Sequence, residues 1–190
     1  IIKEVPTLIE YNKFNDKDYI VLEKKEGSRL SDIFKRSVKY KKEYLMEYGK
    51  SLAKIHNIQN NDFELALQRP INEIANGYKT YDDYSNEILK WLELNNIEKN
   101  YDTFIHGDFH YGNILFKNKK ISGILDMEYS GMGFKEQDIA WACILRPGQK
   151  FMNNINDIKC FLDGYKTLND FDINKFIWCY INGSIHFYLM

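Results

Sequence analysis

The sequence predicts an α+β fold that is mostly helical and carries a small β-hairpin near its centre. Long stretches place apolar residues three or four positions apart, which is the period of an amphipathic helix. Two short apolar runs, Ile114–Phe116 and Ile121–Leu125, flank four polar residues, as in a hairpin. With 190 residues, 44% of them hydrophobic, the chain is large enough to bury the core of one domain.

The first half of the chain predicts one strand and two helices. Tyr19–Leu22 is a short β-prone run and is predicted to form a strand. A helix is expected over residues 31–58, because four apolar residues recur at spacings of three, four and three: Leu45, Tyr48, Leu52 and Ile55. A second helix is expected over residues 80–94, with its apolar residues on one side.

The second half begins with short strands and returns to helices. Thr103–Ile105 is predicted to be a strand that ends at His106-Gly107-Asp108. The hairpin follows, with its turn expected at Lys119-Lys120. From about residue 137 onward helices are expected again, and the last of them has apolar residues at helical spacing: Trp178, Ile181, Ile185 and Leu189.

Charge and cysteine content narrow the class of protein. Lys and Arg total 26 against 27 Asp and Glu, so nothing in the charge balance indicates a nucleic-acid partner. The three cysteines lie far apart without a C-x-x-C motif, which favours a reducing, cytoplasmic location. No apolar run approaches the roughly 18 residues of a membrane span, so no membrane partner is expected.

Three polar residues around the predicted hairpin form a candidate catalytic site. A turn at Lys119-Lys120 places Asn113 opposite Asp126, and facing residues of an antiparallel pair lie roughly 5 Å apart. Asp108 lies on the loop that leads into the hairpin. Two carboxylates and an amide oxygen in one place are ligands that suit Mg²⁺, with phosphates and water completing its shell.

This arrangement is the one that phosphoryl transfer requires. A metal neutralises the phosphates while a separate Asp orients the attacking hydroxyl and accepts its proton. Each residue also has a plainer interpretation. Asp108 is also a common turn residue next to glycine, and Asn113 is a common loop residue after Gly112. The Asp126 carboxylate could be paired with a lysine in place of a metal ion.

Three motifs then resemble the aminoglycoside phosphotransferase and choline kinase superfamily, whose members share the protein-kinase-like fold. They are His106-Gly107-Asp108-x-x-x-x-Asn113, Ile124-Leu125-Asp126 and Asp138-Ile139-Ala140. The resemblance implies that Asp108 is catalytic, that Asn113 and Asp126 hold Mg²⁺, and that Asp138 braces the catalytic loop. Glu128 has two interpretations, because some relatives carry an Asp-x-Glu that touches the metal, whereas an exposed Glu at a strand end needs no such role.

The N-terminal residues resemble the end of the smaller lobe of these kinases. Residues 1–27 are interpreted as a remnant of N-lobe strands and the hinge, and residues 28–190 as the catalytic and acceptor-binding C-lobe. This implies that the adenine edge meets the backbone of Glu23 and Lys25, with Leu115 and Leu125 beneath the ring. No glycine-rich phosphate loop precedes the hinge, so the N-lobe is expected to be largely absent, the chain truncated at both ends, and phosphoryl transfer by these residues alone poor.

Three functional hypotheses follow from the resemblance. The first is a kinase that moves the γ-phosphoryl group of ATP or GTP to an aminoglycoside or similar polyol. The second is a choline- or ethanolamine-type kinase, because Asp126 to Gly133 resembles the D-x-E-Y-x-G-M-G of bacterial choline kinase relatives. The third is a kinase-fold protein that binds without catalysis.

The acceptor is expected to be a small molecule with a hydroxyl group. Residues 61–100 hold eight Asp and Glu against four Lys and Arg, a balance that favours a cationic acceptor. The alternative is that this acidic stretch is simply a solvated face.

Overall fold

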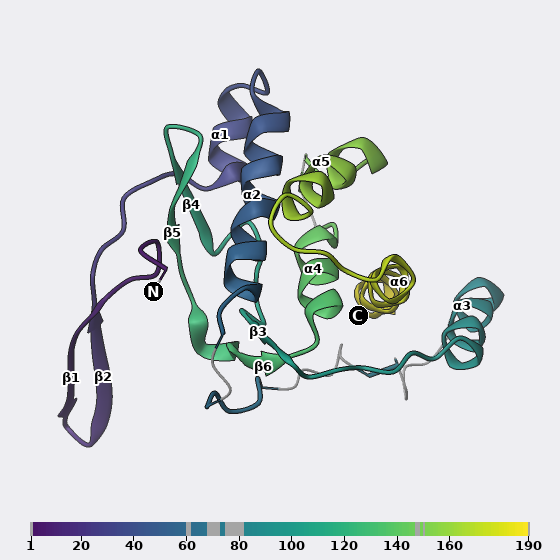
Figure 1. The fold of residues 1–190 in the computed structure, drawn as a ribbon, viewed down its shortest axis with the longest axis horizontal. Coiled ribbons are helices and arrows are strands. Elements are labelled where there is room, and N and C mark those ends of the chain that lie inside the picture. Colours follow the sequence, from purple (N-terminus) through teal and green to yellow (C-terminus); the bar gives the residue numbers. More distant parts are fainter. Residues whose placement is uncertain are drawn as a thin grey trace.

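The computed structural model describes residues 2–59, 62–67, 73–74, 82–146, 149 and 151–189 (Figure 1). The described helices are α1 (Leu30–Arg36), α2 (Lys41–His56), α3 (Asp83–Leu94), α4 (Lys135–Cys143), α5 (Ile155–Tyr165) and α6 (Ile173–Leu189). The described strands are β1 (Leu8–Phe14), β2 (Lys17–Leu22), β3 (Thr103–Ile105), β4 (Ile114–Lys117), β5 (Lys120–Ile124) and β6 (Gly131–Gly133). The mostly helical α+β prediction is confirmed in this part of the chain.

The strands form three antiparallel pairs, β1–β2, β3–β6 and β4–β5. The strands expected at Tyr19–Leu22, Thr103–Ile105 and the central hairpin are all present. Strand β6 was not expected, because its two glycines have low strand propensity. It forms because Met132 exchanges backbone hydrogen bonds with residues 64–66 on one side while the strand pairs with β3 on the other.

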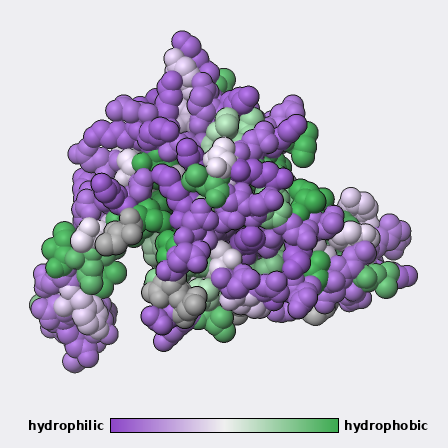
Figure 2. All heavy atoms as spheres, in the orientation of Figure 1, coloured by the Kyte–Doolittle hydropathy of each residue, from purple (hydrophilic) through white to green (hydrophobic). Residues whose placement is uncertain are grey.

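The β1–β2 hairpin extends away from the rest of the protein (Figure 1). All thirteen of its strand residues are exposed. Figure 2 shows apolar side chains over the half of the hairpin nearest the body and hydrophilic ones toward its tip. The fully buried apolar residues of the described chain begin at Leu30, so the core that supports the site is built by the residues after this hairpin.

Helices α2 and α5 cross at close range in the centre of the core. A Cβ atom on Gly49 would clash with the main chain of Phe161, and one on Gly164 would clash with the main chain of Met46. Glycine at both positions lets the two backbones touch. Tyr48 is buried between these helices and the loop of residues 106–113, where its ring stacks on Phe109 at 4.9 Å.

The single helix expected over residues 31–58 is wrong in one respect, because the chain forms two helices there. Helix α1 ends when Ser37 adopts an extended backbone, with φ −162° and ψ 140°. The Ser37 hydroxyl then accepts a hydrogen bond from the Lys39 backbone N–H at 3.2 Å. Serine competes with a helix in this way, because its side chain offers the backbone a local partner.

The C-terminal helices complete the structure around α6, which packs on α4 and α3. The indole N–H of Trp178 on α6 donates to the carbonyl of Leu92 on α3 at 3.1 Å. Helix α3 begins at the Asp82 cap, whose carboxylate accepts from the Ser85 N–H at 2.7 Å. None of the described helices combines the length and hydrophobicity needed to cross a bilayer.

Candidate active site

The loop between β3 and β4, residues 106–113, carries the predicted catalytic residues. Its path depends on Gly107, which has φ +77° and packs against the main chain of Tyr129. A Cβ atom at Gly107 would clash with the Tyr129 carbonyl, and a positive φ is unfavourable for other residues. Glycine at this position therefore permits the loop to lie directly against the segment that follows Asp126.

Asp138, at the start of α4, holds the backbone of this loop. Its Oδ2 accepts from the His106 N–H at 2.9 Å and its Oδ1 from the Gly107 N–H at 3.2 Å. His56 Nε2 lies 3.1 Å from the same Oδ2. Burial alone would raise the pKa of Asp138, but the hydrogen bond and charge of His56 outweigh it, so the pKa is lowered. The brace implied by the family resemblance is confirmed by these contacts.

His106 links the catalytic loop to the end of the hairpin. Its Nδ1 accepts from the Asp108 N–H at 3.2 Å, and its Nε2 lies 3.0 Å from the Leu125 carbonyl. Both bonds require the neutral ring with its proton on Nε2, because a carbonyl accepts and an N–H donates. Burial of the imidazole lowers the pKa of His106, which favours this neutral form.

The free energy of unfolding is therefore expected to depend on pH through His106. Its folded pKa lies below the unfolded value of about 6.5, so the unfolded chain binds a proton first as the pH falls. Stability is expected to decrease from pH 6.5 downward, and His106→Gln is expected to flatten this part of the curve. Urea unfolding between pH 8 and pH 5 measures the free energy of unfolding of the parent protein and of His106→Gln. The same dependence on pH in the two proteins would contradict a neutral, buried His106.

Asp108 is buried, with 9% of the residue exposed, and donors bind both oxygens of its carboxylate. Trp141 Nε1 donates to Oδ1 at 2.7 Å, and Asn113 Nδ2 donates to Oδ2 at 3.2 Å. The same Asn113 nitrogen also lies 3.1 Å from the Asp108 carbonyl, and His110 Nε2 lies 3.7 Å from Oδ2. These contacts fix the plane of the carboxylate.

The hairpin turn lies one residue earlier than expected. Asn118 and Lys119 both have positive φ, 52° and 63°, and Lys117 pairs with Lys120. Two-residue hairpin turns with positive φ match the twist of the strands, and Asn is favoured at such positions. The prediction of a turn at Lys119-Lys120 is therefore wrong by one position.

The facing partner of Asn113 changes accordingly. The Leu125 N–H donates to the Asn113 carbonyl at 2.8 Å, so Asn113 faces Leu125 and Asp126 is the next residue along. A register irregularity between Leu115 and Phe116 keeps this offset to one residue. Asp126 is exposed and has φ +65°, a backbone conformation that aspartate tolerates better than most residues.

The donor set at this end of the hairpin suits a hard cation. Among the described residues, no protein group donates a hydrogen bond to the Asp126 carboxylate or to the side-chain oxygen of Asn113. One carboxylate and one amide oxygen leave most of a Mg²⁺ shell for phosphate and water, which is how Mg²⁺ is usually bound. The residues present therefore fit Mg²⁺ with a nucleotide.

Glu128 lies on the 3₁₀ turn Met127–Tyr129 and is exposed. Nowhere in the described part of the chain do three or more His, Cys, Asp or Glu side chains gather to hold a metal ion. A cation site at Asn113 and Asp126 stays a prediction. A metal contact by Glu128 stays a prediction.

The residues predicted to surround adenine fall into two groups. A Cβ atom on Gly123 would lie 2.9 Å from Lys25 Cβ and 3.3 Å from Leu115 Cβ, so these two residues lie together against β5. Glu23 joins them through an ion pair with Lys25 at 3.0 Å, although its own N–H already donates to a carbonyl before β1. Leu125 is instead bound through its backbone to the catalytic loop. An adenine site here stays a prediction.

Two residues of the site were missed from the sequence. Trp141 follows Asp138 by three positions on α4, a spacing that puts two side chains on one face of a helix. His56 is the last residue of α2 and lies between Asp138 and Tyr165. Its Nδ1 is 2.7 Å from the Tyr165 hydroxyl. The helical spacing was a usable signal for Trp141, whereas the partners of His56 are more than 80 residues away.

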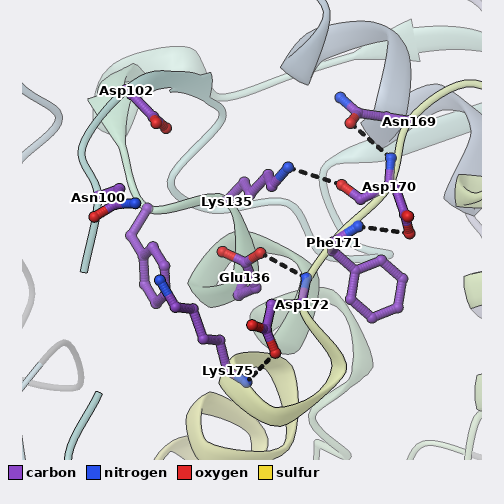
Figure 3. A pocket seen from close by; sticks show the side chains of 10 residues that line it. Asn100, Asp102, Lys135, Glu136, Asn169, Asp170, Phe171, Asp172 and Lys175 are labelled. Carbon is purple, nitrogen blue, oxygen red and sulfur yellow. Dashed lines mark hydrogen bonds between the residues drawn. The ribbon is translucent and has the colours of Figure 1, made fainter. Parts of the chain in front are cut away.

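A separate pocket of about 390 Å³ lies beside the start of α4 (Figure 3). It lies near the pairing of Thr103 with Gly133, at the other end of β3 from the catalytic loop. Its polar groups are bonded to one another: Glu136 accepts from the Asp172 N–H at 3.0 Å, and Lys135 donates to the Asp170 carbonyl at 2.8 Å. The lining residues include none of the predicted site residues; they are Asn100, Asp102, Phe134, Lys135, Glu136, Asn169, Asp170, Phe171, Asp172 and Lys175.

Comparison with protein families gives a match over most of the chain. Residues 3–165 match the model of the phosphotransferase enzyme family. A probable aminoglycoside 3'-phosphotransferase of Lactococcus lactis subsp. lactis (strain IL1403) is 31% identical over 94 residues. That match covers 50% of this chain and 32% of the relative, so the chain spans about a third of the length of that protein.

Solved structures show the same fold. An aminoglycoside-3'-phosphotransferase of type VIII superposes with a TM-score of 0.68 at 15% identity, covering 97% of this chain and 74% of that one. An amicoumacin kinase, hAmiN, solved with AMP-PNP, Ca²⁺ and Ami, gives a TM-score of 0.52 at 16% identity, covering 86% of this chain and 55% of that one. The kinase-like α+β fold expected from the sequence is thereby confirmed.

Proposed function

Because the chain belongs to the phosphotransferase enzyme family, we propose that it serves phosphoryl transfer from a nucleoside triphosphate to a hydroxyl group of a small molecule. The acceptor class proposed first is an aminoglycoside or similar polyol. The observation that carries the proposal is the Asp108 carboxylate, which is buried, held by a donor on each oxygen and adjacent through Asn113 to the exposed Asp126.

The chemistry assigned to this chain is performed by Asp108. Its carboxylate accepts a hydrogen bond from the acceptor hydroxyl, orients the oxygen toward the γ-phosphorus, and takes the proton as the new P–O bond forms. The nucleoside diphosphate leaves as the bond to the γ-phosphorus breaks. Asn113 binds the carboxylate during this step, and Asp138 keeps the loop in place.

Asn113 and Asp126 are the residues that would hold Mg²⁺ with the nucleotide, and Glu128 is a third candidate. When bound, the metal supplies positive charge that neutralises the phosphate oxygens. The proposed nucleotide, ATP or GTP, has its adenine or guanine edge at Glu23 and Lys25, with Leu115 and Leu125 beneath the ring. The proximity of Lys25 to Leu115 at β5 supports this assignment.

A choline- or ethanolamine-type kinase is the second candidate function. The segment from Asp126 to Gly133 supports it, because this motif builds the 3₁₀ turn and the strand beside the catalytic loop. The acidic balance of residues 61–100 suits a cationic acceptor in either case. Much of that stretch lies outside the described residues, so the acceptor is proposed on charge alone.

A cytoplasmic location is part of the proposal. Cys143, Cys160 and Cys179 are free thiols, and Cys143 and Cys179 are buried. Free thiols are typical of a reducing compartment, where ATP and GTP are also available.

A substrate panel tests the proposed function. The complete encoded protein is incubated with Mg²⁺, ATP or GTP, and kanamycin, choline or ethanolamine, and the phosphorylated acceptor is detected by mass spectrometry. We expect phosphorylated kanamycin. Phosphocholine without phosphorylated kanamycin would select the second candidate, and nucleotide binding without any transfer would select a kinase-fold binding protein.

Asp126→Asn is expected to weaken Mg²⁺-dependent nucleotide binding by about ten-fold or more, because it removes the carboxylate from the proposed metal site. Nucleotide binding measured in EDTA is expected to stay the same. Isothermal titration with MgADP and with ADP alone provides the comparison. Equal MgADP affinity in the variant and the parent protein would exclude Asp126 as a metal ligand.

A further inference from the structure

Helix α4 supports the catalytic loop with two residues on one face. Asp138 and Trp141 are three positions apart, so their side chains leave the helix on the same side. Asp138 accepts from the backbone N–H groups of His106 and Gly107, whereas Trp141 donates to the side chain of Asp108. One helix thus holds both the main chain of the loop and the carboxylate it presents.

We propose that Trp141 is a positioning residue for phosphoryl transfer: its indole N–H holds the Asp108 carboxylate in the orientation that receives the acceptor hydroxyl. This inference rests on the proposed function. The contact is short, at 2.7 Å, and it is made to Oδ1, while Asn113 binds Oδ2. A donor on each oxygen opposes rotation of the carboxylate and so fixes its plane.

The indole itself is held in place by neighbouring side chains. The guanidinium carbon of Arg146 lies 4.8 Å from the centre of the Trp141 ring, and its nitrogens donate to the carbonyls of Trp141 and Ile144 at 3.0–3.3 Å. Phe187 of α6 contacts the indole with a centroid distance of 5.7 Å. Because the indole is held in place, its N–H donor has a fixed position relative to the Asp108 carboxylate.

Trp141→Phe separates the hydrogen bond from these packing contacts. Phenylalanine keeps a ring beside Arg146 and Phe187 but has no N–H donor. In the complete encoded protein we expect kcat to fall about 10- to 100-fold, since small displacements of a catalytic group have effects of this size. The KM for nucleotide is expected to stay within about two-fold, because Trp141 acts on Asp108, which is assigned to the acceptor and not to the nucleotide.

A double-mutant cycle distinguishes action through Asp108 from a general loss of structure. In an Asp108→Asn background, Trp141→Phe is expected to cause little further loss, because the two residues act as one unit. Trp178→Phe is the matched control, since it also removes an indole hydrogen bond, to Leu92, but lies in the core. That control is expected to lower Tm and leave kcat unchanged.

A spectroscopic measurement tests the contact without relying on activity. The chain has three tryptophans, so a proton–nitrogen NMR spectrum of the labelled protein contains three indole signals, each assigned by its Trp→Phe variant. Asp108→Ala is expected to shift the Trp141 signal and to leave those of Trp91 and Trp178 in place.

The outcomes separate two kinds of failure. An unshifted Trp141 signal, or a kcat for Trp141→Phe equal to that of the parent protein, overturns the positioning role even if the panel finds an active kinase. A shifted signal in a protein that phosphorylates no acceptor overturns the proposed function, and the catalytic role of Trp141 with it. A shifted signal with the expected loss of kcat supports both.

Discussion

Replacing Asp108 by asparagine is expected to lower phosphoryl transfer by about 10²–10⁴-fold, the range that general-base catalysis contributes. The amide cannot accept the hydroxyl proton. It also has only one oxygen, while Trp141 and Asn113 each donate to one carboxylate oxygen of Asp108. The NH₂ group must therefore face one of these two donors, so the variant loses orientation as well as basicity.

Nucleotide affinity is expected to be nearly unchanged in Asp108→Asn, because Asp108 is assigned to the acceptor and not to the nucleotide. Initial rates of transfer and titration with MgADP provide the two measurements. Asp163→Asn, at an exposed position on α5, is the matched control and is expected to keep the parent rate. Near-normal turnover of Asp108→Asn would show that the catalytic assignment is wrong.

Replacing Asp138 by asparagine is expected to destabilise the fold by about 3 kcal/mol, in the range for a broken buried hydrogen-bond network. The Asp138 side chain is 0% exposed, and its carboxylate is surrounded by three donors: the N–H groups of His106 and Gly107, and Nε2 of His56. An amide of the same size must turn its NH₂ group toward at least one of them.

For a chain of this length the loss corresponds to a Tm lower by roughly 6–12 °C. Activity is expected to fall as well, because the catalytic loop loses its backbone anchor. Asp170→Asn is the matched control: its Oδ1 accepts from the Phe171 N–H at 2.9 Å, and an amide oxygen makes the same bond. Calorimetry measures the Tm of both variants. Equal Tm values for Asp138→Asn and Asp170→Asn would contradict the stabilising role of Asp138.

The lowered pKa of Asp138 adds a pH signature to this result. The carboxylate contributes stability at pH values above its unfolded pKa of about 3.9, and this contribution is lost as the pH falls through the lower folded pKa. The asparagine variant lacks this contribution, so the difference in stability between the two proteins is expected to shrink at acid pH.

The catalytic loop was predictable because its chemistry is local in sequence. Asp108 and Asn113 lie on one loop, and Asp126 lies two residues after β5, the strand that pairs with β4, so short-range turn rules were enough to bring them near one another. The exact register was not predictable. The register depends on whether Asn118-Lys119 or Lys119-Lys120 takes the positive φ angles of the turn. It also depends on the register irregularity between Leu115 and Phe116, which neither residue type predicts.

Features that depend on distant partners were missed. Strand β6 contains two glycines, which have low strand propensity, but residues 64–66 supply backbone hydrogen bonds to its Met132. His56 becomes part of the site only when the α2–α5 crossing brings it to Asp138 and Tyr165. Helical periodicity also failed at Ser37, where a local side-chain bond ends α1, although the apolar spacing continues into α2.

The most direct test is to locate a bound cation relative to Asp108. Addition of Mn²⁺ with ADP to the labelled protein broadens the NMR signals of nearby nuclei. We expect broadening of the Asn113 side-chain amide, the Asp126 and Asp108 backbone amides and the Trp141 indole, with the Trp178 indole unaffected. Broadening centred instead on Glu136 and Asp172, or absent at Asn113 and Asp126 in a protein that binds nucleotide, would contradict a shared site for metal and acceptor.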